Sequence, residues 1–334
     1  MTLTHNLKPL NISLIDTGTP REEIDEPLGI EMVAGRLRNR FDDLQVNIYL
    51  QFMKLPGYET VQDSILRNSR VVGISTKLNS YDKLKDIVER TRYLEKQPLV
   101  VIGNMYSTYA FNHVLGDYPE VVCVRGEGED AFYGIMETLV KNPNIDNREI
   151  KGRLIQRDVP NLIFVYGGKV VETPRKLIDL SKVPRPSRDL LPQVLSERGV
   201  VLVEGSRGCP WSRCKYCAIV GKYGYPGWRP FPIDWIIEEL IDLSDAGVRS
   251  PYFTDEDFFG SNPYRALEIS ERIIEAKQEG MIRPDLNIYF NARVNTILGY
   301  GFGGTEKSIP LLLRLKEAGL REIFLGIESG SKNQ

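Results

Sequence analysis

The residues best suited to chemistry are three clustered cysteines, Cys209, Cys214 and Cys217. A disulfide would use two of these thiols and leave the third unpaired, and a structural zinc site needs four ligands. The histidines are His5 and His113, and the fourth cysteine, Cys123, lies in a different predicted domain. Thiols clustered in this way more often bind a metal or do redox chemistry than form a structural disulfide.

Three thiolates without a fourth local ligand favour an iron-sulfur cluster. A cubane of four irons normally takes four thiolates, so three cysteines leave one iron with an open position for a substrate or cofactor. A chance grouping of buried cysteines fits poorly with the polar neighbours Ser212, Arg213 and Lys215. We therefore favour a metal cluster over the disulfide, the zinc site and the chance grouping.

The elements that must hold this loop form a repeating strand and helix pattern from about Gly199 onward. Strands are predicted at 200–204, 250–254, 286–291 and 322–327, with helices at 233–246, 264–279 and 309–318. This is the first half of a parallel α/β barrel, in which chemistry takes place at the carboxyl ends of the strands. No helix pattern follows the cysteines directly, so we place them on a loop at the end of the first strand. The chain stops after the fourth strand, which leaves an exposed apolar edge, and we expect it to be a fragment.

The first 141 residues show a second alternating pattern. Predicted strands lie at 12–15, 46–50, 71–75, 99–102 and 121–124, and helices at 27–41, 84–94 and 131–140. The strands are almost wholly apolar, as expected when helices cover both faces of a parallel sheet. The pattern predicts a doubly wound, flavodoxin-like α/β domain, whose ligand would lie beyond the carboxyl ends of the strands.

Residues 142–195 are predicted to connect the two domains. Two β-rich runs at 161–173 surround Gly167-Gly168, a pair suited to a type I′ hairpin turn. Pro184, Pro186 and Pro192 then exclude a continuous helix or a central strand. The predicted organisation is a first domain at 1–141, a connector at 142–195 and a partial barrel at 196–334.

Composition narrows the class of protein. The chain has 334 residues, of which 42% are hydrophobic and 26% charged, which is enough for two buried cores. No stretch reaches the roughly 20 apolar residues of a membrane span, and the N-terminus lacks the apolar core of a secretion signal. We expect a cytoplasmic location. The net charge is −2, and no long basic run points to nucleic acid.

The cysteine loop resembles the signature of the radical S-adenosylmethionine (SAM) superfamily. Members usually carry C-x3-C-x2-C with an aromatic residue before the last cysteine, a place that Tyr216 takes here. The first gap departs from that pattern, because residues 210–213 make it four residues long. The resemblance implies a 4Fe-4S cluster whose open iron chelates SAM, and reductive cleavage to a 5′-deoxyadenosyl radical. It also implies an electron donor of the flavodoxin or ferredoxin type.

The same resemblance nominates SAM contacts at the ends of the later barrel strands. An acidic segment after the second strand would approach the methionine amino group, polar residues after the third its carboxylate or the ribose, and residues after the fourth the ribose. The residues so implied, with the aromatic of the loop, are Tyr216, Asp255, Glu256, Asn291, Arg293, Glu328 and Ser329. For each acid, a solvated loop charge or a helix cap stays an alternative.

Residues 10–140 resemble the cobalamin-binding domain that often precedes a radical SAM barrel. The resemblance rests on the segments 26–29, 72–79, 101–108 and 124–129. It implies cobalamin contacts at Ser75, Thr76, Asn79, Gly103, Asn104, Thr108, Gly126 and Glu127. The D-x-H-x-x-G sequence that supplies an axial histidine in many such domains is absent, so binding would proceed without that ligand. A domain that binds nothing and only shields the barrel is the alternative.

Together these features predict a cobalamin-dependent radical SAM methyltransferase that acts on an unactivated carbon of a small molecule or peptide. The alternatives are cyclisation, rearrangement or methylthiolation by a radical SAM enzyme, or a paralogue that holds a cluster without turnover. Methylthiolation of tRNA is disfavoured because those enzymes carry a second set of three cysteines, and the front domain has only Cys123. Cys123 itself is predicted to be a core residue.

Overall fold

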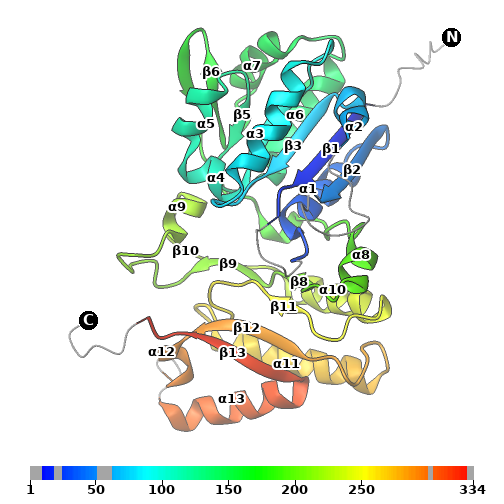
Figure 1. Cartoon of the computed structure of the whole chain (residues 1–334). Helices are drawn as coiled ribbons and strands as arrows, with labels where there is room; N and C mark the ends of the chain where they lie inside the picture. Colours follow the sequence, from blue (N-terminus) through cyan, green and yellow to red (C-terminus); the bar gives the residue numbers. More distant parts are fainter. Residues whose placement is uncertain (1–9, 19–24, 51–61, 300–303, 329–334) are drawn as a thin grey trace, which may run out of the picture. The chain divides into compact units, whose positions relative to one another are not determined.

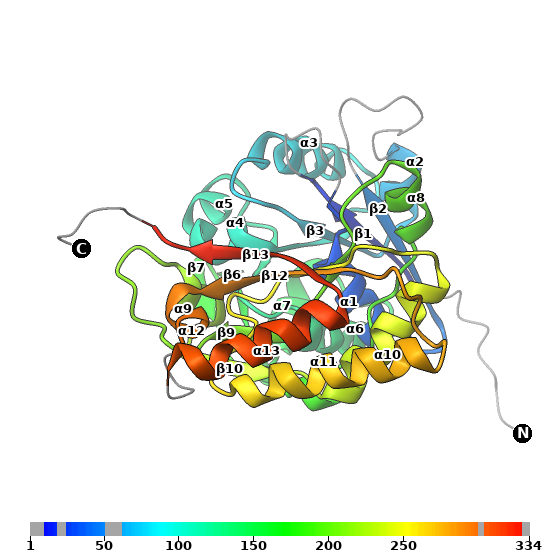
Figure 2. The ribbon, with the colours of Figure 1, turned by 90° about the horizontal axis from the view of Figure 1, so that it is seen from below.

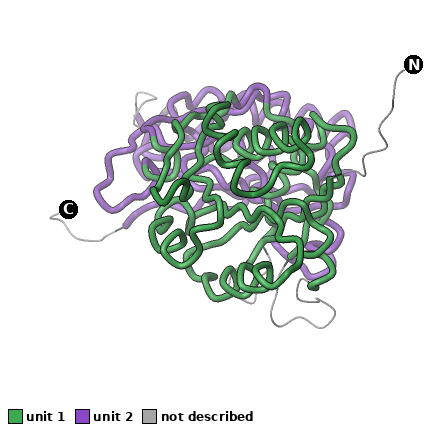
Figure 3. The backbone as a smooth tube through the Cα atoms, turned by 90° about the horizontal axis from the view of Figure 1, so that it is seen from above, with its two compact units in different colours: residues 1–179, 183–190, 221–224 green, residues 180–182, 191–220, 225–334 purple. Residues whose placement is uncertain are grey.

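The computed structural model describes residues 10–18, 25–50, 62–299 and 304–328 (Figure 1). The chain divides into two compact units, which Figure 3 shows in different colours. The first comprises residues 1–179, 183–190 and 221–224, and the second comprises residues 180–182, 191–220 and 225–334. The short segment 221–224 therefore packs with the first unit although it follows the cysteines in sequence.

The first unit alternates strands and helices almost throughout. Its strands are β1 (Leu10–Asp16), β2 (Leu44–Leu50), β3 (Val71–Ser75), β4 (Leu99–Gly103), β5 (Val122–Val124), β6 (Leu162–Tyr166) and β7 (Lys169–Glu172). Its helices are α1 (Leu28–Arg38), α2 (Asp63–Asn68), α3 (Tyr81–Arg92), α4 (Asn104–Tyr109), α5 (Phe111–Asp117), α6 (Glu129–Lys141) and α7 (Asn147–Gln156).

These strands form one sheet in the order β2-β1-β3-β4-β5-β6-β7. The first five pair in parallel, as the apolar runs predict, and β6 and β7 add to the sheet in antiparallel fashion. The predicted doubly wound α/β fold is confirmed. The hairpin lies within the predicted connector, where Gly167 and Gly168 have φ angles of 60° and 75° and so supply the left-handed turn.

Helices cover both faces of this sheet, which explains why its strands do not alternate between apolar and polar residues. On one face α1, α6 and α7 bury residues such as Val33, Ile135 and Leu154 against Leu14 of β1. On the other face α3 and α5 bury residues such as Ile87 and Val114. Burying apolar surface on both sides at roughly 25 cal/mol per Å² is the main source of stability for such a layer. Cys123 is wholly buried in this second layer, so its predicted role as a core residue is confirmed.

Among the buried charged groups of the first unit are an ion pair made by Arg188 and the side chain of Lys151. Arg188 contacts the carboxylate of Glu26 and lies 3.8 Å from that of Glu31, and both glutamate side chains are fully buried. Burial, followed by the charge of Glu26, raises the pKa of Glu31 well above its usual value. The segment that precedes the second unit is thus tied to α1 by a buried ion pair.

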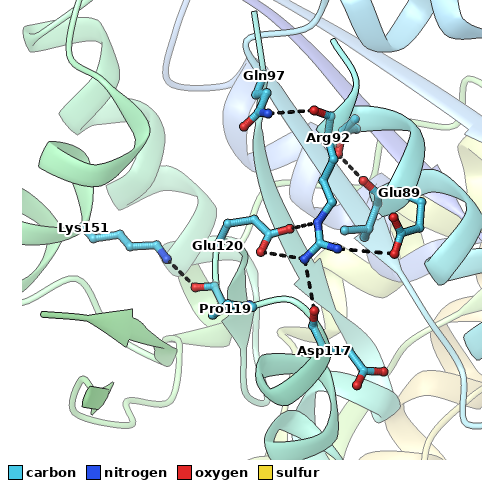
Figure 4. Close-up of polar contacts among 9 residues, drawn as sticks. Glu89, Arg92, Gln97, Asp117, Pro119, Glu120 and Lys151 are labelled. Carbon is cyan, nitrogen blue, oxygen red and sulfur yellow. Dashed lines mark hydrogen bonds and ion pairs between the residues drawn. The ribbon is translucent and has the colours of Figure 1, made fainter. Parts of the chain in front are cut away.

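The second buried charge is Lys151 of α7. Its Nζ donates to the backbone carbonyls of Pro119 and Val165, both at 3.1 Å. Figure 4 shows Lys151 directed at Pro119, whose neighbour Glu120 contacts Arg92. Burial lowers the pKa of this lysine to about 8.

The second unit holds the remaining elements. Its strands are β8 (Leu202–Val203), β9 (Ser206–Cys209), β10 (Gly227–Pro230), β11 (Tyr252–Phe253), β12 (Ile288–Arg293) and β13 (Leu320–Gly326). Its helices are η1, a 3-10 turn (Leu180–Lys182), α8 (Leu191–Ser196), α10 (Ile233–Asp245), α11 (Pro263–Gln278), α12 (Val294–Ile297) and α13 (Thr305–Ala318). The short helix α9 (Ile219–Tyr223) is shared between the two units.

Four of these strands form a parallel sheet in the order β13-β12-β11-β8. The helices α13, α11 and α10 lie side by side along it (Figure 2). This is the predicted succession of strand and helix steps of a partial α/β barrel, and all four predicted strands are present. Within the described residues, no helix has the length and apolar character needed to cross a membrane.

Candidate cluster and cofactor site

The cysteine loop has a two-stranded base that the sequence analysis does not predict. β9 pairs antiparallel with β10, and Cys209, the last residue of β9, lies opposite Gly227. The strands come very close at Gly208, where an added Cβ would lie 2.1 Å from the carbonyl oxygen of Gly227. Since Gly208 also has a φ of 87°, only glycine fits here without strain. The loop 210–226 is thus closed at its base by a short ladder.

All three cysteines are free thiols that solvent can reach. Cys209 is half-buried, and Cys214 and Cys217 are exposed. The amide of Cys217 donates to the carbonyl of Cys214 at 3.2 Å, which bends this stretch into a turn. The loop runs directly into α9, which begins at Ile219, so the expectation of no immediate helix is wrong. A helix of little more than one turn is too short for an apolar period to show.

Ser212 accommodates the four-residue first gap. Its φ of 46° is left-handed, and its hydroxyl donates to the carbonyl of Cys209. The hydroxyl oxygen of Ser212 also accepts a hydrogen bond from the amide of Gly227 at 3.2 Å. One side chain therefore joins the turn of the loop to both strands of its base, a local bonding pattern that is common for serine in turns.

The two acids after β11 point at the strand that leads to the cysteines. Asp255 is fully buried and accepts from the amide of Gly205 at 2.8 Å and from the hydroxyl of Ser206. Glu256 accepts from the amide of Gly208 at 2.9 Å. Burial raises the pKa of Asp255 to about 7, although the hydrogen bond from Ser206 opposes the shift.

The polar residues of β12 lie beside these acids. The side-chain amide of Asn291 donates to the carbonyl of Asp255 at 2.9 Å and accepts from the hydroxyl of Tyr252 at 2.6 Å. Arg293 donates to the buried carboxylate of Asp257 at 2.6 Å. The ends of β11 and β12 thus come together as predicted for neighbouring parallel strands.

The fourth strand ends near the aromatic residue of the cysteine loop. Partial desolvation, followed by the charges of Glu328 and Cys214, raises the pKa of Tyr216, although the side chain is 66% exposed. Glu328 itself has a left-handed φ of 61°. Three predicted positions from two distant segments therefore lie together. Ser329, the other predicted residue of this strand end, lies outside the described residues.

Arg265 of α11 is a residue that the sequence analysis missed. Its guanidinium is buried and donates to the carbonyls of Gly205 at 2.9 Å and Phe231 at 2.8 Å. A signal was available, since Arg265, Ile269 and Ile273 recur at helical spacing. A charged residue on the apolar stripe of a helix is expected to have a buried partner.

In the first unit, the predicted residues at the ends of β3 and β4 contact one another. The side chain of Asn104 donates to the hydroxyl of Ser75 at 2.9 Å, and the amide of Thr76 donates to the carbonyl of Gly103 at 3.2 Å. Asn104 has a left-handed φ of 74°. The Thr76 hydroxyl is buried without a hydrogen-bond partner among the described residues.

The predicted residues near β5 divide into two groups. The amide of Gly126 donates to the hydroxyl of Thr108 at 3.1 Å, so these two lie together. Glu127 is buried and accepts from the amide of Ile178 at 2.7 Å, which directs its carboxylate toward the segment after the hairpin. Asn79 is exposed beyond the end of β3.

Both cofactor classes can be tested against these residues. Three free thiols in one loop are the donor set of a cluster with one open iron. Among the described residues, no three His, Cys, Asp or Glu side chains gather as the shell of a single metal ion would. At the edge of the first sheet, a Cβ built on Gly103 meets nothing within 4 Å, so the strand end borders open space. The three thiols of the loop are thus the residue types that a cluster needs, and the edge of the first sheet is open beside Gly103.

Comparison with known proteins points to the same two kinds of cofactor. Residues 19–136 match the model of the B12 binding domain. Hopanoid C-3 methylase of Methylococcus capsulatus is 25% identical over 91% of this chain and 53% of its own length. 4'-Phospho-dehydrooxetanocin synthase of Priestia megaterium is 27% identical over 71% of this chain and 31% of its own length. The chain thus matches a B12 binding domain in its first third and is similar over most of its length to proteins named as a methylase and a synthase.

Solved structures of cobalamin-dependent radical SAM enzymes share this fold. OxsB with aqua-cobalamin bound superposes with a TM-score of 0.79 at 21% identity, over 97% of this chain and 45% of that one. TsrM from Kitasatospora setae, with cobalamin and a [4Fe-4S] cluster bound, gives a TM-score of 0.68 at 16% identity, over 95% and 60%. The chain thus spans between 31% and 60% of the length of these proteins.

Proposed function

We propose that this chain binds a 4Fe-4S cluster, SAM and cobalamin, and that it belongs to an enzyme that methylates an unactivated carbon of a small molecule or peptide. The observation that carries this proposal is the presence of a B12 binding domain and a loop of three free cysteines on one chain. The name of one relative supports the outcome, since hopanoid C-3 methylase is a methylase.

In this proposal each group of residues has a stated task. Cys209, Cys214 and Cys217 would hold three irons of the cluster. When bound, the cluster would supply the electron that cleaves the sulfonium of SAM, and cobalamin would carry the methyl group. An electron donor of the flavodoxin or ferredoxin type would reduce the cluster.

The strand ends of the second unit would bind SAM beside the cluster. Glu256 and Glu328 would face its ammonium and ribose, while Asn291 and Arg293 would hold its polar groups. Asn291 is already bonded to the carbonyl of Asp255 and Arg293 to the carboxylate of Asp257, which holds these two side chains in place and lowers the entropy lost on binding.

At the edge of the first sheet, the residues around Gly103 and Gly126 would bind cobalamin. Small residues there let the backbone approach a planar macrocycle, and the hydroxyls of Ser75 and Thr108 lie at the same edge. No histidine is needed as an axial ligand in this arrangement.

The test uses the protein purified without oxygen and supplied with iron, sulfide, hydroxocobalamin, SAM and a chemical reductant. A methyltransferase of this kind uses SAM in two ways, so both S-adenosylhomocysteine and 5′-deoxyadenosine should form. The first product should require cobalamin and the second should require the cluster. A protein that cleaves SAM but neither binds cobalamin nor forms S-adenosylhomocysteine contradicts the methyl-transfer proposal.

A second candidate is a radical rearrangement without methyl transfer. The observation that favours it is the match to 4'-phospho-dehydrooxetanocin synthase, whose name is that of a synthase. In that case 5′-deoxyadenosine should form without S-adenosylhomocysteine, in the presence of bound cobalamin. The ratio of the two products therefore separates the two candidates before any substrate is known.

A further inference from the structure

The two ends of the cysteine loop meet at one backbone carbonyl. The carbonyl of Gly205, just before β9, accepts from the amide of Phe231, just after β10, at 3.0 Å. It also accepts from Nη2 of Arg265 at 2.9 Å, and the same nitrogen donates to the carbonyl of Phe231 at 2.8 Å. One guanidinium nitrogen from α11 therefore joins the start and the end of the segment that carries all three cysteines.

A carboxylate holds the same point from the other side. Asp255 accepts from the amide of Gly205 at 2.8 Å and from the hydroxyl of Ser206. The backbone amide of Gly205 is thus bonded to the acid Asp255, and its carbonyl is bonded to the cation Arg265. Glu256 adds a third contact through the amide of Gly208, next to Cys209.

Both charged groups are buried, which makes their contacts specific. Asp255 is 0% exposed and Arg265 is 7% exposed. Hydrogen bonds to charged groups are about twice as strong as those between neutral groups, and a buried charge requires partners in fixed positions. The guanidinium carbon of Arg265 also lies 5.7 Å from the ring centroid of Trp228 in β10. A side chain of the same ladder therefore packs against the guanidinium.

We propose that Arg265 and Asp255 are positioning residues that clamp the base of the cysteine loop and so place Cys209 for cluster binding. This inference rests on the proposed function, because it assigns the clamp to a cluster-binding loop. It gives Asp255 a role different from direct contact with SAM, since the backbone of Gly205 and the hydroxyl of Ser206 occupy its carboxylate.

The test compares cluster retention in matched variants of the whole chain. Arg265→Met removes both bonds to the loop, and Arg265→Lys keeps one positive charge and can restore one of them. The control is Arg272→Met on the same helix, where the arginine pairs with Asp234 at the surface. After reconstitution with iron and sulfide, an iron chelator should strip the cluster at least about tenfold faster from Arg265→Met than from the wild type, because the loss of even one of the two charged hydrogen bonds has about this effect.

The conservative variants give a readout that general destabilisation would not produce. Arg265→Lys should recover part of the chelator resistance, and Asp255→Asn should lose it although its shape is nearly unchanged. Cobalamin binding should stay at the wild-type level in all of them because it belongs to the first unit. Equal rates of cluster loss in Arg265→Met and Arg272→Met would overturn the inference.

A measurement without any cluster separates this inference from the proposed function. Amide hydrogen exchange of residues 205–209 should be about tenfold faster in Arg265→Met than in Arg272→Met. If the wild type assembles no cluster but these amides respond, the proposed function fails and the clamp remains. If the cluster forms and the amides do not respond, only the clamp fails.

Discussion

The indole ring of Trp228 lies directly against Gly260. A Cβ built on Gly260 would come within 2.0 Å of the ring, and the glycine has a left-handed φ of 60°. Trp228 belongs to β10, and Gly260 follows the acidic segment after β11. The contact therefore joins the ladder under the cysteine loop to the turn that carries Asp255.

Replacing Gly260 with alanine should destabilise the protein by about 2 kcal/mol or more, because the ring must move and the backbone angle becomes strained. Unfolding in urea measures this loss. Gly247→Ala is the matched control, since Gly247 has a φ of 90° but nothing within 4 Å of an added Cβ. An equal loss in both variants would mean that backbone strain alone accounts for the effect and that the ring contact is unimportant.

Alanine at Cys209, Cys214 or Cys217 should each abolish the brown absorbance of the reconstituted protein and lower its iron content. The reason is that each thiolate holds a different iron of the cluster. Absorbance and iron analysis on anaerobically reconstituted samples provide the measurement. Cys123→Ala is the control and should keep the full cluster, because Cys123 is buried in the first unit. Retained absorbance in any of the first three variants would show that the ligands are assigned wrongly.

Lys151 should make stability depend on pH in a defined window. Its pKa is about 8 in the folded chain and 10.5 in the unfolded chain. Between these values the unfolded chain binds more protons, so the contribution of Lys151 to the free energy of unfolding rises with pH. The wild type should therefore gain stability relative to Lys151→Met between about pH 7.5 and about pH 10.

The nearby groups that titrate are Glu120 and Cys123. Both are present in the wild type and in Lys151→Met, so their own titration largely cancels in the comparison. Urea unfolding of the two proteins across the window provides the measurement. A difference in the free energy of unfolding that stays constant with pH would contradict the burial of a charged lysine at this place.

Replacing Arg188 with methionine should cost about 3–5 kcal/mol, because two buried carboxylates lose their counter-charge. Arg38→Met is the control, since Arg38 pairs with Asp189 where both side chains are 37% exposed. That pair should contribute about 1 kcal/mol or less. Thermal and urea unfolding measure both variants, and a loss in Arg38→Met as large as that in Arg188→Met would refute the distinction.

Much of the fold was predictable because its strands are buried runs of apolar residues. Val71–Ser75 matches its predicted bounds, and the first turns of α10 and α11 lie where the periodicity places them. The β9 and β10 ladder was not predictable, because its strands are short and contain Gly208 and Pro230. Neither residue is typical of a strand, and the pairing depends on the contact with Gly227.

The candidate site was likewise predictable only in part. The three cysteines were predicted from residue types and their place after a predicted strand, and the acids after β11 were nominated by the family resemblance. What each acid touches could not, because Asp255 and Gly205 are distant in sequence and meet only when β8 and β11 pair. Arg265 needed a different argument, in which a charged residue on an apolar helix face implies a buried acceptor.

The β9 and β10 ladder closes the cysteine segment, and this affects how far the length of the segment can vary among related proteins. The entropy of loop closure depends only weakly on loop length, so one more residue between the first two cysteines adds little when the ends are already paired. Residues can then be inserted into the loop between β9 and β10 while the two strands keep the same pairing register. A pair of short strands that flank the cysteines is therefore a better sign of a distant relative than a fixed spacing between the cysteines.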